Sequence, residues 1–295
     1  MPSRFTIVAI VLFWLGTAAA VGYRDVWPRL FSDGPPPVSI DLADEATQSA
    51  PTRWRIFRGE EKVGDLTTRM EYLTGDDTFR YVSHYRNLSF RFFNVTIVVP
   101  SLDTVVRLAR DGSLREQHMT GTLEAQLKGI KVAGASAVVD GYVVNGELVG
   151  RCQLKDSPFG DVDRPLDPVP VPAGQVLNPM MPVNRLRDVQ PGRRWTIRLS
   201  DPLADSLAVL MKELAGKSQV AAGSLPKAND RELLAEVRST PETIVRRDGE
   251  RIDCWVIEYR GDDAIARTWV SRIDGRVLRQ EATGFGDTLR FERDD

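Results

Sequence analysis

Most of this chain alternates between apolar and polar side chains with a period of two, and this pattern constrains the fold more than any other feature. Residues 66–72 and 79–85 both follow it. Such alternation is typical of antiparallel strands that bury one face. After Asn87 the apolar positions shift in phase to Leu88 and Phe90, which predicts a bulge where a long strand bends. Long bent strands predict a curved sheet.

Turn signals between the apolar runs predict hairpins. Asn-Gly and Asp-Gly pairs favour the tight turns that join antiparallel strands. We expect roughly twelve to fourteen strands, in one group up to residue 154 and a second from 233 to 293. The turns are expected at residues 59–61, 111–112, 145–146 and 274–275.

The two groups are separated by a proline-rich insertion at residues 155–193. It cannot supply interior strands, because proline lacks the N–H that a strand ladder needs. We expect it to wrap over the surface and to be followed by a strand at 194–199. A helix then begins with Asp201 as its cap and ends at Gly216. Its apolar face should cover the concave side of the sheet, and it consists of Leu203, Leu207, Leu210, Met211 and Leu214.

The amino terminus contains an uncharged segment at residues 5–23, preceded by a tail of residues 1–4. A helix of roughly 20 apolar residues spans a bilayer. The alternative is a cleaved signal peptide, with a cleavage site among the alanines at 18–20. The length of the run favours an uncleaved, single-pass anchor. Both interpretations place residues 53–295 outside the cytoplasm, and the anchor places the protein in the cell membrane.

Residues 24–52 form an acidic, proline-rich spacer between the anchor and the domain. Pro35, Pro36 and Pro37 favour extended geometry. Residues 40–46 have the composition of one helical turn, which could dock on the domain. We favour a plain spacer.

The composition excludes several classes of protein. The 39 basic and 41 acidic residues give a net charge of -2, which argues against a nucleic-acid partner. Two histidines and two cysteines are too few for a zinc finger or an iron–sulfur cluster. No phosphate-binding loop or dinucleotide fingerprint occurs, so we expect no cofactor.

Candidate catalytic and metal-binding residues also have ordinary explanations. His84 and His118 lie 34 positions apart in polar strands, without the spacing of a metal site. Asp161, Asp163 and Asp167 resemble calcium ligands in type, but the glycine and glutamate of a calcium loop are missing. Residues 134–137 lack the second glycine of a nucleophile elbow, and we interpret them as packing residues. We therefore expect a protein that is not an enzyme.

Cys152 and Cys254 each share an apolar face with neighbouring strand residues. An extracytoplasmic location permits a disulfide between them. We favour two separate core thiols over this bridge.

The sheet has more apolar surface than one helix can cover. This surplus points to a hydrophobic ligand or a protein partner. We expect the aromatic residues of the domain and the helix face to enclose a ligand site. The expected lining comprises Trp54, Phe90, Phe92, Trp195, Leu207, Leu210, Leu214, Trp255 and Trp269.

Two segments carry a resemblance to a known family. They are Trp-Arg-Ile-Phe-Arg-Gly-Glu-Glu-Lys-Val-Gly at residues 54–64 and Thr-Trp-Val-Ser-Arg-Ile-Asp-Gly-Arg-Val-Leu-Arg-Gln-Glu at 268–281. They resemble an uncharacterised family of bacterial extracytoplasmic domains related in shape to the lipoprotein carriers. The resemblance implies an open half-barrel with helices against its concave face and a cavity for an acyl chain. The chain differs from those domains in its anchor and in its proline-rich insertion, which weigh against a shuttling role.

These features together predict a mainly β protein with a large curved antiparallel sheet, one covering helix and an N-terminal transmembrane helix. The expected function is to hold a lipid or an acylated peptide, or lipoprotein, in the half-barrel. One alternative is a structural partner of membrane proteins in an envelope complex, without a ligand. The other is a hydrolase of envelope polymers.

Overall fold

A computed structural model of the chain provides the structure. It describes residues 14, 17, 42–47, 50–92, 95–157, 160–171, 182–199, 203, 231–261, 265–284 and 287–294.

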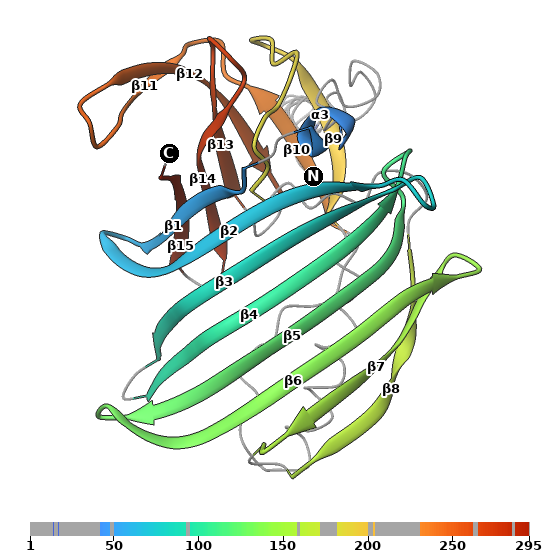
Figure 1. The fold of residues 1–295 in the computed structure, drawn as a ribbon. Coiled ribbons are helices and arrows are strands. Elements are labelled where there is room, and N and C mark those ends of the chain that lie inside the picture. The colour runs from blue at the N-terminus through green and yellow to red at the C-terminus, as the bar shows by residue number, and fades with distance from the viewer. Residues whose placement is uncertain are drawn as a thin grey trace, which may run out of the picture.

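The described part of the chain forms one antiparallel sheet of fifteen strands (Figure 1). The first eight strands are β1 Thr52–Arg58, β2 Glu61–Leu73, β3 Thr78–Phe92, β4 Val95–Ala109, β5 Leu114–Leu127, β6 Ile130–Val144, β7 Glu147–Lys155 and β8 Val162–Pro170. The other seven are β9 Arg194–Leu199, β10 Arg231–Val237, β11 Glu242–Val245, β12 Arg251–Arg260, β13 Ile265–Ser271, β14 Val277–Gly284 and β15 Asp287–Arg293.

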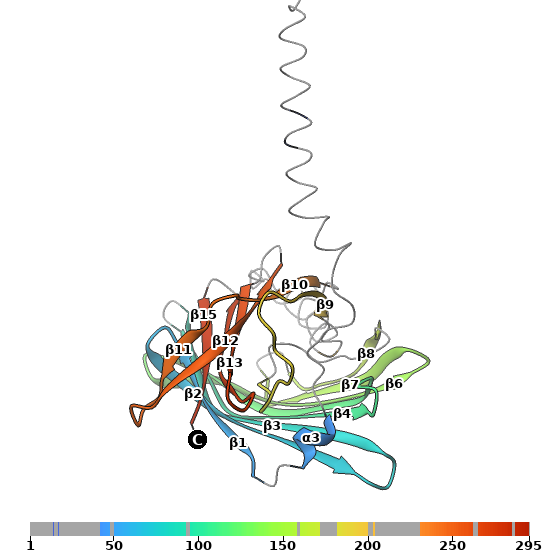
Figure 2. The same ribbon diagram turned by 90° about the horizontal axis from the view of Figure 1, so that it is seen from above.

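The two groups of strands join where the first strand meets the last. β1 pairs with β2 on one side and with β15 on the other, with Trp54 opposite Arg293. The order runs β8-β7-β6-β5-β4-β3-β2-β1-β15-β14-β13-β12-β10-β9, and β11 also pairs with β12. β8 and β9 are therefore the two edges, and the sheet is not closed. Figure 2 shows that β2–β8 curve into a trough. The predicted large, curved antiparallel sheet is confirmed.

The hairpin turns lie where the sequence predicts them. Asn145 and Gly146 have φ angles of 52° and 81°, as their two-residue turn requires. Asn87, where β3 changes phase, has a φ of 55°. β9 has the predicted bounds. Part of the proline-rich insertion differs from our expectation, because it forms β8 instead of wrapping over the surface. The edge position tolerates its prolines, since one side of an edge strand needs no partner.

Three apolar clusters stabilise the sheet. The first joins both groups of strands, with Ile56 and Leu66 from one group and Val237 and Ile257 from the other. We call the face of the sheet that carries these residues the inner face and the opposite face the outer face. The second is also on the inner face, under β2–β8, and contains Leu108 and Val139 among its buried residues. The third lies on the opposite, outer face of β11–β14. β12 is thus apolar on both faces, as its sequence suggests.

A short helix, α3 Leu42–Ala46, docks on the sheet. Leu42 is buried in the second cluster, and the Glu45 carboxylate accepts hydrogen bonds from the backbone N–H groups of Asn184 and Arg185. The interpretation of this turn as part of a plain spacer is therefore corrected. Apolar contact and two buried hydrogen bonds fix it to the domain.

Two predicted helices lie almost wholly outside the described residues. The covering helix at 201–216 is represented by Leu203, which is buried in the second cluster. The membrane anchor at 5–23 is represented by Trp14 and Thr17. Among the residues that the structure describes, we find no helix with the length and apolar character to span a bilayer.

Cys152 and Cys254 are both free and buried, so the interpretation as two separate core thiols is confirmed and the alternative, a disulfide, is not found. Cys152 lies in β7 in the second cluster, whereas Cys254 lies in β12 in the third cluster, on the other face of the sheet. A disulfide requires Cα atoms within about 7 Å of each other. The sequence shows that each cysteine has apolar neighbours, but the two sets of neighbours belong to different cores.

Candidate functional site

Four of the predicted lining residues meet in the first inner cluster. Trp54 and Trp195 are buried there, and Phe90 and Trp255 are partly buried against it. The Trp54 indole N–H donates a hydrogen bond of 3.1 Å to Thr68 Oγ1. Trp54 and Trp195 thus hold the two groups of strands together, and little of either side chain is accessible to a ligand.

Trp269 is separated from these residues by the sheet. It belongs to the third cluster on the outer face. Its indole N–H donates a hydrogen bond of 2.8 Å to Glu242 Oε2, and the guanidinium of Arg279 lies 5.6 Å from its ring centre. The prediction that Trp269 lines the same site as Trp54 is therefore corrected. Alternation assigns residues to two faces but does not say which face is concave.

The other predicted lining residues lie outside the described part of the chain. The backbone of Phe92 ends β3, but its side chain is not described. Leu207, Leu210 and Leu214 belong to the undescribed segment 204–230.

A row of apolar residues on the inner face, at one end of β3–β6, remains partly exposed. Cross-strand pairing places Phe90 opposite Ile97, and Leu127 opposite Ile130. Leu123 is 44%, Leu127 43% and Ile130 71% exposed. Alanines continue this face on β6. We call this surface the inner apolar strip, consisting of Phe90, Ile97, Val99, Leu123, Leu127, Ile130, Ala133 and Ala135.

The β5 and β6 part of this strip was not predicted from the sequence. We interpreted residues 134–137 as packing residues, whereas Ala133 and Ala135 lie on the inner face beside Leu123 and remain partly exposed. The available signal was the Lys128-Gly129 turn, where the φ angles of 51° and 81° form a hairpin. Leu127 and Ile130 flank that turn directly.

The two histidines lie on the outer face, each beside an aspartate of the neighbouring strand. His84 Nδ1 is 2.8 Å from Asp103 Oδ1, and His118 pairs in the same way with Asp140. Burial works against ionisation of Asp103, but hydrogen bonds from Arg86 and His84 outweigh it and lower its pKa. Within the described ranges no three side chains of His, Cys, Asp or Glu gather as a metal site. These are cross-strand hydrogen bonds on a polar surface.

The aspartates of residues 161–167 are also engaged locally. Asp163 forms a two-pronged ion pair with Arg151, which lowers its pKa. Asp161 accepts a hydrogen bond of 3.1 Å from the backbone N–H of Asp156. The guanidinium of Arg151 thus supplies the positive charge and the hydrogen-bond donors for the Asp163 carboxylate.

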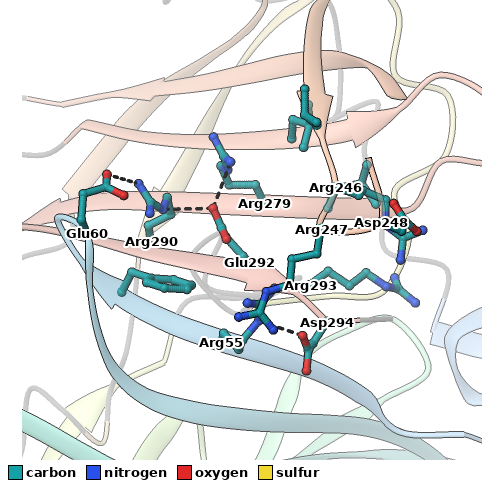
Figure 3. A pocket seen from close by; sticks show the side chains of 14 residues that line it. Arg55, Glu60, Arg246, Arg247, Asp248, Arg279, Arg290, Glu292, Arg293 and Asp294 are labelled. Carbon is teal, nitrogen blue, oxygen red and sulfur yellow. Dashed lines mark hydrogen bonds and ion pairs between the residues drawn. The ribbon is translucent and has the colours of Figure 1, made fainter. Parts of the chain in front are cut away.

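A polar pocket of about 620 Å³ lies on the outer face, between the β11–β12 hairpin and strands β1, β14 and β15 (Figure 3). β1 contributes Arg55 and Phe57, whose neighbours Trp54 and Ile56 point to the core. A bulge in β14 turns both Leu278 and Arg279 outward, because Val277 pairs with Val270 and Arg279 with Trp269. Six arginines line the pocket: Arg55, Arg246, Arg247, Arg279, Arg290 and Arg293.

Ion pairs fix several of these side chains. Arg55 Nε lies 2.8 Å from Asp294 Oδ1. Glu292 Oε1 lies 2.9 Å from Arg279 Nη2 and 3.1 Å from Arg290 Nε. Arg290 is also 3.3 Å from Glu60, which is 92% exposed. The carboxylate of Glu292 thus forms ion pairs with two guanidinium groups in the pocket. A sequence scan cannot find this pocket, because its arginines come from positions 55, 246–247 and 279–293.

Comparisons with known proteins give a distant structural match. No family model matches the chain, and no curated protein matches it. The crystal structure of a β-barrel-like protein of domain of unknown function DUF1849, from Brucella abortus, is similar over 83% of this chain and 94% of that chain. The sequence identity is 10% and the TM-score 0.35. The strand order and register above define the class here as a mainly β protein with a large, open, half-barrel-like antiparallel sheet.

Proposed function

We infer that this protein is a binding protein whose curved sheet holds the acyl chain of a lipid or of an acylated peptide on its inner face. The inner apolar strip carries this proposal. Leu123, Leu127 and Ile130 are exposed on the concave side, where a soluble domain normally buries such residues. The ligand supplies the apolar contact that the described part of the chain does not.

Acyl chains fit this surface chemically. Each methylene transferred from water to an apolar surface contributes about 0.8 kcal/mol. The strip offers aliphatic and aromatic side chains without a charged residue among them. Such a surface binds by contact area and shape, so it suits an unbranched apolar chain better than a polar polymer.

The rest of the proposal concerns location. Residues 5–23 anchor the chain in the cell membrane, and residues 53–295 lie on the extracytoplasmic side. An anchored domain stays beside the bilayer, where lipids and acylated proteins are its nearest ligands. It needs no catalytic residues, because capture and presentation of the acyl chain are its whole task.

Native mass spectrometry with lipid extraction tests this function on the full chain purified from a bacterial envelope. We expect lipid or acylated peptide to be bound at a near-stoichiometric level. Changing Leu127→Glu together with Ile130→Glu should raise the dissociation constant for the lipid by about tenfold or more, and tenfold corresponds to about 1.4 kcal/mol. Both side chains are exposed, so the fold should tolerate the change.

Ile273→Glu is the matched control. Ile273 is 87% exposed in the β13–β14 turn, far from the strip in the strand order. This variant should keep the bound lipid. A wild-type chain that stays free of ligand after exposure to a panel of lipids would contradict the proposal and favour a structural partner of membrane proteins.

A further inference from the structure

The arginine-lined pocket lies on the opposite face of the sheet from the inner apolar strip. Arg55, Arg279 and Arg290 rise from the outer face of β1, β14 and β15, which form its floor. Arg246 and Arg247 approach from the turn of the β11–β12 hairpin, which forms a wall (Figure 3). Two parts of the chain far apart in sequence therefore direct guanidinium groups into one space.

The charge of the pocket differs in sign from that of the whole chain. Four carboxylates, Glu60, Asp248, Glu292 and Asp294, line it together with the six arginines. Glu250, just outside the lining, pairs with Arg246 at 3.3 Å, so the positive charges of the pocket exceed the negative charges by one. The whole chain, in contrast, has a net charge of -2. A local excess of this kind attracts anions.

The resident carboxylates do not use all the hydrogen-bond donors. A guanidinium has five N–H donors in a planar fork. Arg279 gives its terminal Nη2 to Glu292, and its Nε is buried, so its other terminal nitrogen, Nη1, is the donor that a ligand can reach. Arg247 is exposed, and no described acid forms an ion pair with it. Donors therefore remain for a ligand on the floor and on the wall of the pocket.

Apolar groups beside the arginines strengthen the attraction. Leu278 is buried in the lining, and the guanidinium groups of Arg55 and Arg290 lie 5.8 Å and 5.1 Å from the centre of the Phe57 ring. The Arg55 side chain is 11% exposed. Charges next to apolar groups are less screened by water than charges on an open surface.

We propose that this pocket binds a phosphoryl group, with Arg247 and Arg279 as its main contacts. A phosphoryl group offers three acceptor oxygens to donors on the floor and on the wall of the pocket, whereas a carboxylate offers two. The phosphoryl oxygens also match the forked donors of arginine. The volume of about 620 Å³ leaves room for the organic body of a phosphate ester or of a lipid headgroup.

Isothermal titration calorimetry of the full chain, in nanodiscs of phosphatidylcholine, with inorganic pyrophosphate tests the site. We expect one saturable binding event whose affinity falls with added salt. Arg247→Gln should weaken it by about tenfold, and Arg279→Gln should do the same. Arg247 lies in an exposed turn, so Arg247→Gln should not disturb the fold. It therefore tests anion binding even if Arg279→Gln disturbs the packing against Trp269.

Arg115→Gln is the control, because Arg115 is exposed and lies beside Asp111 as Arg247 lies beside Asp248. It should leave the affinity unchanged. Absence of saturable binding, or an equal loss in Arg115→Gln, would overturn the proposal. Adding phosphatidic acid to the nanodisc identifies the source of the phosphoryl group. Loss of pyrophosphate binding indicates that a lipid headgroup reaches the pocket, and unchanged binding indicates a soluble phosphate ester.

Discussion

The carboxylate of Glu45 accepts a hydrogen bond of 2.8 Å from the backbone N–H of Arg185, 140 positions further along the chain. The adjoining residue Asn184 donates a second backbone hydrogen bond of 3.2 Å to the same carboxylate, and its own carbonyl accepts one of 3.0 Å from the Val277 N–H. A single buried acid thus links the start of the domain to the end of the proline-rich insertion and, through it, to the β13–β14 hairpin.

Replacing Glu45→Ala should lower the free energy of unfolding by about 2 kcal/mol, because two buried N–H groups lose their acceptor. Glu45→Gln should cost less, since its amide oxygen still accepts a hydrogen bond. Urea unfolding of the full chain in mild detergent measures both. Glu60→Ala serves as the exposed control and should leave the midpoint unchanged. If Glu45→Ala unfolds at the same urea concentration as the wild type, the link has no energetic role.

Glu258 should make the fold sensitive to acid. Its side chain is buried on the outer face and contacts Arg238, Arg260 and Arg267. Burial works against its ionisation, but the hydrogen bond from Arg260 and the three positive charges outweigh this effect and hold its pKa below the ordinary 4.5. The folded pKa is thus below the unfolded one. The stabilisation is complete above about pH 4.5 and is lost as the pH falls through the lowered pKa.

Glu258→Gln should therefore be less stable at neutral pH and should lose less stability than the wild type between about pH 5 and about pH 3. Thermal unfolding at a series of pH values measures this difference. Glu250→Gln, an exposed control, should follow the wild-type curve. If the unfolding temperatures of Glu258→Gln and the wild type fall equally between about pH 5 and about pH 3, Glu258 is not the titrating group.

Gly150 should tolerate no side chain. It pairs with Gly141 across β6 and β7, and a Cβ at this position would lie 2.1 Å from the backbone oxygen of Asp140. Backbone atoms of a central strand cannot move away cheaply. Gly150→Ala should thus cost about 2 kcal/mol or more. Gly75→Ala is the control, because no atom lies within 4 Å of its Cβ position. Equal unfolding midpoints for the two variants would contradict a close approach of the two backbones at Gly150.

Both cysteines should react as thiols only after unfolding. Burial raises the pKa of both thiols, that of Cys254 to about 12, so little thiolate is present at neutral pH. Labelling with iodoacetamide should modify neither residue in the native chain and both in urea without a reductant. Failure to label unfolded chain that has never been reduced would indicate a disulfide.

Local signals made the strand pattern predictable. The alternation in residues 66–72 fixes which side chains share a face, and the Asn145-Gly146 turn fixes the register between β6 and β7. The bounds of β9 could be predicted because its residues lie between Pro191 and the expected helix cap Asp201. These features depend on neighbours in sequence, so the sequence alone contains them.

Contacts between distant segments were not predictable. Trp54 and Trp269 are both tryptophans in predicted strands, and the sequence does not distinguish their positions. Trp54 lies in the cluster on the inner face, whereas Trp269 lies in the cluster on the outer face. The curvature that decides this depends on bulges such as the one at Leu278. Docking of α3 depends on Asn184 and Arg185, which lie in an irregular segment without a sequence pattern. The arginine pocket likewise needs the pairing of β1 with β15.

The central claim is that an acyl chain lies on the inner apolar strip, and photo-crosslinking tests it most directly. The full chain in nanodiscs of phosphatidylcholine would be irradiated with a diazirine-labelled fatty acid, digested and analysed by mass spectrometry. Our account predicts crosslinks within residues 123–135 and on Phe90 or Ile97, and their loss when Leu127→Glu and Ile130→Glu are combined. Crosslinks confined to other surfaces, such as the turn at Ile273, would contradict it.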